Sequence, residues 1–216
     1  MSITILIADD HAVVREGLRT ILEVTGDFEI IGEAGDGRDA VNKAELLRPD
    51  VILMDISMPE LNGIEATRLI RERIPATKII ILSMHHSNEY VNRATQAGAR
   101  AYILKESAGC NVIYAIRAVM RGRYYFGEGI ETPRVKGRQT PTLLKSPLDK
   151  LSRRERETLQ LVVEGNTNSA IALLFNISSK SVETYRSRLM LKLGITNVPA
   201  LVIFALQHGI ISIPEN

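Results

Sequence analysis

The first 125 residues alternate short apolar runs with longer segments of helical periodicity, and this alternation constrains the fold more than any other feature of the sequence. We expect a helix after each of five strands, which lie at residues 3–8, 28–34, 51–54, 79–83 and 101–104. The middle strands are apolar nearly throughout, as expected for a parallel sheet that helices cover on both faces. The alternation therefore predicts a doubly wound α/β domain with a five-stranded parallel sheet.

The alternation stops after the fifth unit, where glycine, proline and basic residues interrupt the pattern. Such a stretch is typical of a linker between two domains. We expect a first domain at residues 1–126, a linker at 127–147 and a second domain at 148–216. Because proline and glycine break the linker, we do not expect it to transmit a rigid twist from one domain to the other.

Short helices with clear caps make up the second domain. A capping box begins at Ser152, and Thr167 and Ser178 can cap two further helices, the second of which ends at Gly194. A fourth helix is expected at residues 198–208. The pattern predicts an all-α domain of four helices that contains a helix-turn-helix.

Composition excludes several classes of protein. Apolar residues make up 45% and charged residues 24% of the chain, so we expect it to fold. The apolar runs are far shorter than the ~20 residues of a membrane span, and the first residues lack the basic start of a signal peptide. We therefore expect a cytoplasmic protein with no membrane partner. Cys110 is the only cysteine, which excludes an intrachain disulfide and a cysteine-based zinc site.

Charge divides unevenly along the chain. Residues 1–127 carry 15 basic and 17 acidic side chains, whereas residues 128–216 carry 12 and 8. The basic half favours a polyanionic partner.

Polar residues follow the predicted strands in a pattern that indicates a site. Asp9 and Asp10 follow the first strand, Asp55 the third and Lys105 the fifth, and Ser83 ends the fourth. In a flavodoxin-like sheet these positions meet at the carboxyl edge, where such folds bind ligands. Crowded carboxylates repel one another unless a cation joins them, and Mg²⁺ suits this set of oxygen ligands. A carboxylate can accept a phosphoryl group, and the metal, a hydroxyl and an ammonium can neutralise its oxygens.

These residues resemble the receiver domain of two-component response regulators. The matching segments are residues 7–11 (IADDH), 53–59 (LMDISMP), 81–85 (ILSMH) and 101–105 (AYILK). The resemblance implies that Asp55 is phosphorylated, with Ser83 and Lys105 assisting the transfer. Glu106 departs from the proline that many receivers have after the lysine.

The resemblance also implies a metal site and a switch residue. Asp10, Asp55 and the carbonyl of Ser57 would bind Mg²⁺, and Asp9 would help through a water molecule. Tyr102 matches the aromatic residue that turns inward when the Ser83 hydroxyl engages the phosphoryl group.

The second domain resembles the LuxR-type helix-turn-helix, and the pair of domains resembles the NarL/FixJ subfamily. The matching residues include 151–157 (LSRRERE), 165–168 (GNTN), 181–189 (SVETYRSRL) and 192–194 (KLG). Ala170 departs from the usual glutamate, and Tyr185 stands where histidine is commoner. The residues expected to contact DNA are Lys180, Ser181, Glu183, Thr184, Arg186, Ser187, Arg188 and Lys192.

The expected DNA contacts fall into two groups. Glu183 can accept a hydrogen bond from cytosine N4, and Thr184 can touch a thymine methyl group. The basic side chains are better placed for phosphates. The helix at residues 198–208 is apolar nearly all round, so one side can pack on the core and the other on a second molecule. The resemblance implies a transcriptional regulator, not an enzyme, with duplex DNA, a histidine kinase and, on activation, a second copy of itself as partners.

Three other functions share parts of this pattern. A phosphatase of the haloacid dehalogenase kind needs a second aspartate two positions after the first, and here that residue is Ser57. An RNA-binding antiterminator is disfavoured by the groove-facing helix. A regulator that binds DNA without phosphorylation is disfavoured by the complete acidic pocket, and it stays open.

Overall fold

The computed structural model describes residues 2–131 and 146–211. The chain divides into two compact units, Met1–Arg134 and Val135–Asn216. The division falls within the predicted linker, most of which lies outside the described residues. Each unit has its own apolar core and is described separately.

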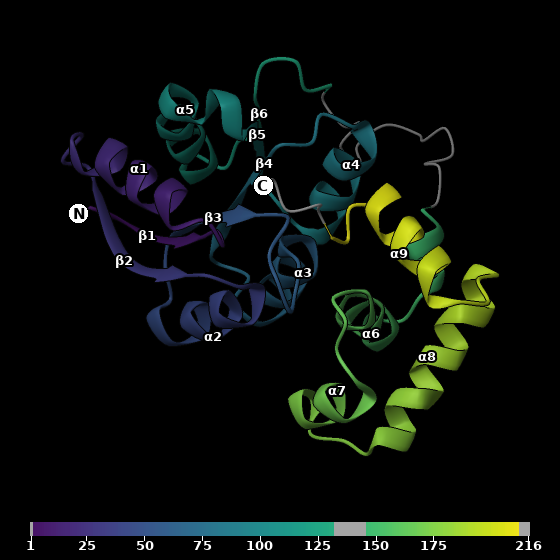
Figure 1. Ribbon diagram of the computed structural model, residues 1–216. Helices are drawn as coiled ribbons and strands as arrows, with labels where there is room; N and C mark the ends of the chain where they lie inside the picture. The colour runs from purple at the N-terminus through teal and green to yellow at the C-terminus, as the bar shows by residue number, and fades with distance from the viewer. Residues whose placement is uncertain (1, 132–145, 212–216) are drawn as a thin grey trace. The chain divides into compact units, whose positions relative to one another are not determined.

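A parallel sheet forms the centre of the first unit (Figure 1). Its strand order is β2-β1-β3-β4-β5-β6, the doubly wound order in which strands one and three flank the switch point. The strands are β1 (Ile3–Ala8), β2 (Phe28–Ala34), β3 (Val51–Asp55), β4 (Lys78–Ser83), β5 (Ala101–Leu104) and β6 (Tyr125–Phe126). The predicted flavodoxin-like fold is confirmed.

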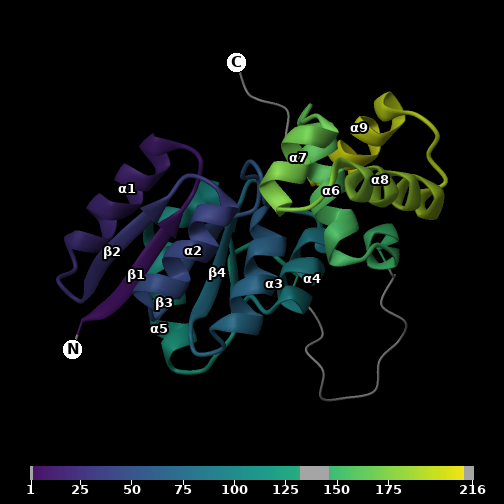
Figure 2. The same cartoon turned by 90° about the horizontal axis from the view of Figure 1, so that it is seen from below.

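Helices cover both faces of this sheet (Figure 2). They are α1 (Ala12–Glu23), α2 (Gly37–Leu47), α3 (Gly63–Arg73), α4 (Asn88–Ala97) and α5 (Ala108–Met120). Successive strand residues point to opposite faces, so Leu6 and Ile52 pack towards α2, α3 and α4, whereas Ile7 and Leu53 pack towards α1 and α5. This explains why the middle strands are apolar on both sides.

The sheet has one strand more than the sequence predicted. After α5 the chain turns at Gly122, with φ of 75°, and returns alongside β5, where Tyr125 pairs with Ala101 and Phe126 with Tyr102. Gly127 N donates to the carbonyl of Tyr102 at 2.9 Å. The predicted number of strands, five, was therefore one too few. The sequence does not reveal the edge strand β6, because two residues are too few to show the alternation of side chains in a strand.

The second unit consists of short helices. They are a 3₁₀ turn η2 (Pro147–Lys150), α6 (Arg153–Val163), α7 (Asn168–Phe175), α8 (Ser179–Leu193) and α9 (Val198–Gln207). Ser152, Thr167 and Ser178 cap α6, α7 and α8, and the capping box of Ser152 with Glu155 is complete. Gly194 ends α8 in the left-handed conformation with φ of 70°. The predicted four helices are confirmed.

Among the described helices, no single one combines the length and the apolar composition of a membrane span. The helices α8 and α9 reach these dimensions only when they are counted together across a 66° bend.

Gly63 holds the start of α3 against the end of β3. A Cβ atom at this position would lie 1.8 Å from the carbonyl oxygen and 2.8 Å from the carbonyl carbon of Asp55. Gly63 N also donates to the carbonyl of Ile56 at 2.9 Å. Because both neighbours are backbone atoms, they cannot move aside as a side chain can. The end of β3 thus depends on a residue without a side chain.

We expect Gly63→Ala to lower the free energy of unfolding of the first unit by about 1–3 kcal/mol through overpacking. Gly17→Ala is the matched control, because Gly17 lies on α1 and a Cβ atom added there would have no atom within 4 Å; it should stabilise the helix by about 0.5–1 kcal/mol. Urea titration followed by tyrosine fluorescence measures both. Equal stabilities of the two variants would contradict the packing described here.

Candidate functional site

An acidic pocket lies at the carboxyl edge of the sheet, where the sequence predicted it. Asp9 follows β1 directly, Asp55 is the last residue of β3, Ser83 is the last residue of β4 and Lys105 follows β5. Register places these strand ends side by side, with β1 and β4 on either side of β3. The parallel topology therefore brings together residues that are far apart in the sequence.

One ammonium group forms ion pairs with two buried carboxylates in this pocket. Lys105 Nζ lies 2.8 Å from Asp9 Oδ2 and 3.0 Å from Asp55 Oδ2. The side chains of Asp9 and Asp55 are 1% and 3% exposed. Apart from these ion pairs, the two oxygens have no hydrogen-bond donor within residues 2–131 and 146–211. The pocket thus holds more acceptors than its own donors satisfy.

The electrostatics of the pocket follow from burial and crowding. Burial raises the pKa of Asp55 to about 6, and the nearby Asp9 adds to the effect while Lys105 opposes it. Burial lowers the pKa of Lys105, but the attraction of Asp55 and the hydrogen bond with Asp9 outweigh it and hold this pKa above its ordinary value. The surroundings of Asp55 therefore carry too little positive charge to offset the cost of burying its ionised carboxylate.

The pocket residues fit a divalent cation. Asp9, Asp10, His11 and Asp55 each offer one ligand atom, and these four atoms all lie within 4.8 Å of one another. Asp10 is exposed, whereas Asp9 and Asp55 are buried. Carboxylate oxygens are the ligands that Mg²⁺ prefers. Ser57, whose carbonyl was expected to contribute, lies two residues after the end of β3.

Ser83 and Tyr102 are joined through the loop after β4. His85 N donates to Ser83 Oγ at 3.0 Å, and the hydroxyl of Tyr102 donates to the carbonyl of His85 at 2.8 Å. Tyr102 is 1% exposed, and burial raises its pKa. The imidazole of His85 stacks on the ring of Tyr90, the third residue of α4, at 4.2 Å between centroids. A change at Ser83 can thus reach α4 through contacts that exist in this structure.

Arg15 is a site residue that sequence reasoning missed. Its Nη1 donates to the carbonyl of Asp9 at 2.8 Å, and its Nε donates to Glu33 Oε2 at 3.0 Å. It therefore ties the backbone at the end of β1 to β2. An arginine four residues after an exposed histidine looks like an ordinary helix surface residue, so only the fold reveals this contact.

The residues expected to contact DNA lie along α8. Val182 and Leu189 are buried and face the core of the second unit. Six of the expected residues are exposed and two are partly buried; the exposed ones are Lys180, Glu183, Thr184, Ser187, Arg188 and Lys192, and the others are Ser181 and Arg186. A helix that buries one side and presents polar side chains on the other suits a DNA groove.

Two of these basic side chains have partners within the second unit. Arg186 Nη1 donates to Asn168 Oδ1 on α7 at 2.7 Å, and Lys192 Nζ donates to Glu155 Oε2 on α6 at 2.6 Å. Burial raises the pKa of Glu155, but the hydrogen bonds from Lys192 and Ser152 outweigh it and lower this pKa below its ordinary value. These contacts brace α8 against its neighbours. Of the basic residues expected to contact DNA, Lys180 and Arg188 make no such contact among the described residues.

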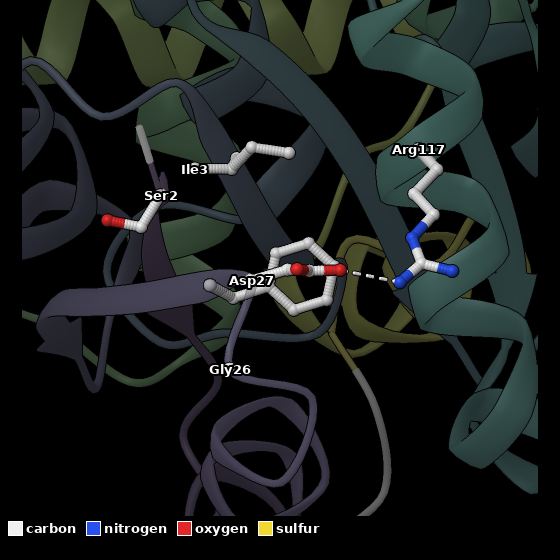
Figure 3. A pocket seen from close by; sticks show the side chains of 6 residues that line it. Ser2, Ile3, Gly26, Asp27 and Arg117 are labelled. Atoms are coloured by element: carbon white, nitrogen blue, oxygen red, sulfur yellow. Dashed lines mark hydrogen bonds and ion pairs between the residues drawn. The ribbon is translucent and has the colours of Figure 1, made fainter.

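A separate hollow lies at the amino edge of the sheet (Figure 3). It is lined by Ser2, Ile3, Gly26, Asp27, Phe28 and Arg117. Asp27 and Arg117 form an ion pair of 2.6 Å across it. Because Ile3 and Phe28 begin their strands, this hollow is at the opposite edge from the acidic pocket.

Comparison with known proteins agrees with both halves of the structure. Residues 5–117 match the family of response regulator receiver domains, and residues 149–205 match the LuxR family of bacterial regulatory proteins. The transcriptional regulatory protein MctR of Rhizobium johnstonii is 38% identical over 210 residues, 97% of this chain and 96% of MctR. The oxygen regulatory protein NreC of Staphylococcus aureus is 38% identical over 213 residues, 96% of this chain and 98% of NreC.

A solved structure is similar over most of this chain. The RcsB response regulator of Salmonella typhimurium is 27% identical with a TM-score of 0.57, over 94% of this chain and 97% of RcsB, and RcsB has also been solved in complex with DNA. The chain therefore belongs to the two-component response regulators that join a receiver domain to a LuxR-type helix-turn-helix domain, and it is a transcriptional regulator of the NarL/FixJ type.

Proposed function

We propose that this regulator is switched by transfer of a phosphoryl group to Asp55 in the presence of Mg²⁺. One observation carries the proposal: the buried carboxylates of Asp9 and Asp55 share the single ammonium of Lys105, and apart from it their Oδ2 atoms have no hydrogen-bond donor among the described residues. The phosphoryl donor would be a histidine kinase, as is general for receiver domains. A carboxylate oxygen of Asp55 would form the new bond to phosphorus while the bond from phosphorus to the donor nitrogen breaks.

The residues of the pocket have separate roles in this step. Mg²⁺, when bound, neutralises charge on the phosphoryl oxygens. Asp10, Asp55 and the carbonyl of Ser57 would hold it, with Asp9 acting through water. Lys105 would give up one of its two present ion pairs, with Asp9 or with Asp55, and would contact a phosphoryl oxygen instead. Ser83 can offer its hydroxyl, and the loop that contacts Ser83 would then pass the change to Tyr102.

The second unit is proposed to bind duplex DNA through α8. Support comes from the exposed polar side of α8, from the basic excess of this half of the chain and from the DNA complex of RcsB. Glu183 and Thr184 would read bases, and Lys180 and Arg188 would contact phosphates. Ser181 and Ser187 lie beside these residues. Arg186 and Lys192 would contact phosphates only by sharing or leaving their present partners, Asn168 and Glu155.

The organisation of the active protein completes the proposal. A receiver domain at residues 1–126 and a DNA-binding domain at 148–216 would be joined by a linker at 127–147. The protein would act in the cytoplasm, where promoters are accessible, and would form a homodimer on activation. Ile203 of α9 is 57% exposed among apolar neighbours, which makes α9 one candidate surface for the second copy.

The phosphorylation proposal predicts a single modified residue. Incubation with acetyl phosphate and Mg²⁺ should add one phosphoryl group to the intact mass, and chelation of Mg²⁺ should prevent it. Asp55→Asn should abolish the addition, because the amide is not a nucleophile of this kind, whereas Asp27→Asn at the opposite edge should leave it unchanged. Phosphorylation that persists in Asp55→Asn would assign the site to another residue.

If α8 binds DNA as proposed, substitutions of a phosphate-contacting residue and of a base-contacting residue should affect DNA binding differently. Arg188→Ala should weaken binding to all duplexes alike and flatten the log–log salt dependence by about one unit, since one phosphate contact is lost. Glu183→Ala should instead relax the preference at one base pair. Fluorescence anisotropy with a panel of duplexes, at several salt concentrations, separates the two. An equal loss on all sequences in Glu183→Ala would remove this residue from base readout.

A further inference from the structure

His11 lies in the acidic pocket without a role in the proposed phosphoryl transfer. It precedes α1 as its N-cap residue, with φ of −89° and ψ of 110°, but its side chain makes no capping hydrogen bond. Instead, the ring is directed to the carboxylates: Nδ1 lies 2.7 Å from Asp10 Oδ1 and 3.3 Å from Asp9 Oδ1. The backbone N–H of His11 also donates to Asp9 Oδ1 at 2.9 Å, which holds the residue beside that oxygen.

These distances suit ligands that share one metal ion. In octahedral coordination at about 2.1 Å, two adjacent ligand atoms lie about 3 Å apart. The two separations of His11 Nδ1 from the carboxylate oxygens bracket this value. The four ligand atoms of Asp9, Asp10, His11 and Asp55 also fall within 4.8 Å. An imidazole nitrogen thus occupies a position that a metal ligand would take.

An independent observation shows that the pocket lacks positive charge. Asp9 is buried, and its Oδ2 has no hydrogen-bond donor among the described residues beyond the ion pair with Lys105. The same holds for Asp55 Oδ2. Within the part of the chain described, Lys105 is therefore the only lysine or arginine that forms ion pairs with the two buried carboxylates, Asp9 and Asp55. A divalent ion would balance the remaining charge.

We propose that His11 supplies a nitrogen ligand through Nδ1, so that the pocket binds borderline divalent ions such as Mn²⁺ and Co²⁺ more tightly than its oxygen ligands alone would. This inference rests on the proposed metal-binding pocket and adds one ligand to it. Imidazole suits transition metals, whereas Mg²⁺ prefers oxygen. His11 therefore sets which ion the receiver domain carries when several are present.

The experiment uses the full chain loaded with Mn²⁺ in a buffer free of nitrogen ligands. Electron spin echo spectroscopy should show the modulation of a directly coordinated imidazole nitrogen in the wild type. His11→Gln should lose this signal, because its side chain can offer only an amide oxygen. His208→Gln in the second unit is the matched control and should keep the signal.

Calorimetric titration gives a second measurement. We expect His11→Gln to bind Mn²⁺ about tenfold more weakly and to change Mg²⁺ affinity by less than about twofold. Because the ring is 65% exposed and makes no capping bond, the variant should remain folded, which circular dichroism checks.

Two results would overturn the inference. If wild-type protein shows no coordinated nitrogen, the contact of His11 with Asp10 is a hydrogen bond only. If the signal persists in His11→Gln, the nitrogen belongs to another residue. Neither result affects phosphorylation of Asp55 with Mg²⁺, so failure of this inference is distinguishable from failure of the proposed function.

Discussion

The contact of Lys105 with both Asp9 and Asp55 is the interaction on which the rest of the site depends. Two carboxylates buried at adjacent strand ends repel each other, and one ammonium group at 2.8 and 3.0 Å offsets only part of that repulsion. The pocket is stable enough to form, yet it retains affinity for further positive charge. This excess of negative charge favours binding of a divalent ion. A phosphoryl group, which is itself anionic, could then be accommodated beside that ion.

The same constraint explains how a change at Asp55 can reach the surface. Ser83 ends the strand beside β3, and the loop after it contacts both Ser83 and Tyr102 through the backbone of His85. The ring of His85 in turn stacks on Tyr90 in α4. A phosphoryl group that accepts a hydrogen bond from the Ser83 hydroxyl and draws its oxygen towards Asp55 would lengthen the hydrogen bond that Ser83 Oγ accepts from His85 N. The surface formed by α4 and β5 is therefore the part of the receiver domain that this geometry couples most directly to the pocket.

Much of this architecture is visible in the sequence because parallel strands place their ends at one edge. Asp9, Asp55, Ser83 and Lys105 could be assigned to that edge from strand positions alone. The helix caps Ser152 and Thr167 were equally readable, because capping depends on local spacing. Strand positions and helix caps follow from local or periodic patterns, so they can be predicted from the sequence without knowledge of the packing.

Other features depend on packing between distant segments and gave no such signal. The strand at Tyr125–Phe126 is defined by its pairing with β5, and Gly63 is required by the carbonyl of Asp55 rather than by a turn. The contact of Lys192 with Glu155 spans 37 residues, so a side chain assigned to DNA from its spacing also braces α8 within its own domain. The role of a residue such as Lys192 therefore depends on the partner that the tertiary structure brings to it.

We propose that the state of Asp55 controls DNA binding by the second domain. The most direct test of this proposal is the affinity of the full chain for its preferred duplex, measured with and without acetyl phosphate in the presence of Mg²⁺. We expect phosphorylation to raise the affinity of the wild type, and we expect Ser83→Ala to take up phosphate but to respond weakly. Equal affinity of the phosphorylated and unphosphorylated wild type would contradict the account and favour a regulator that binds DNA independently of phosphorylation.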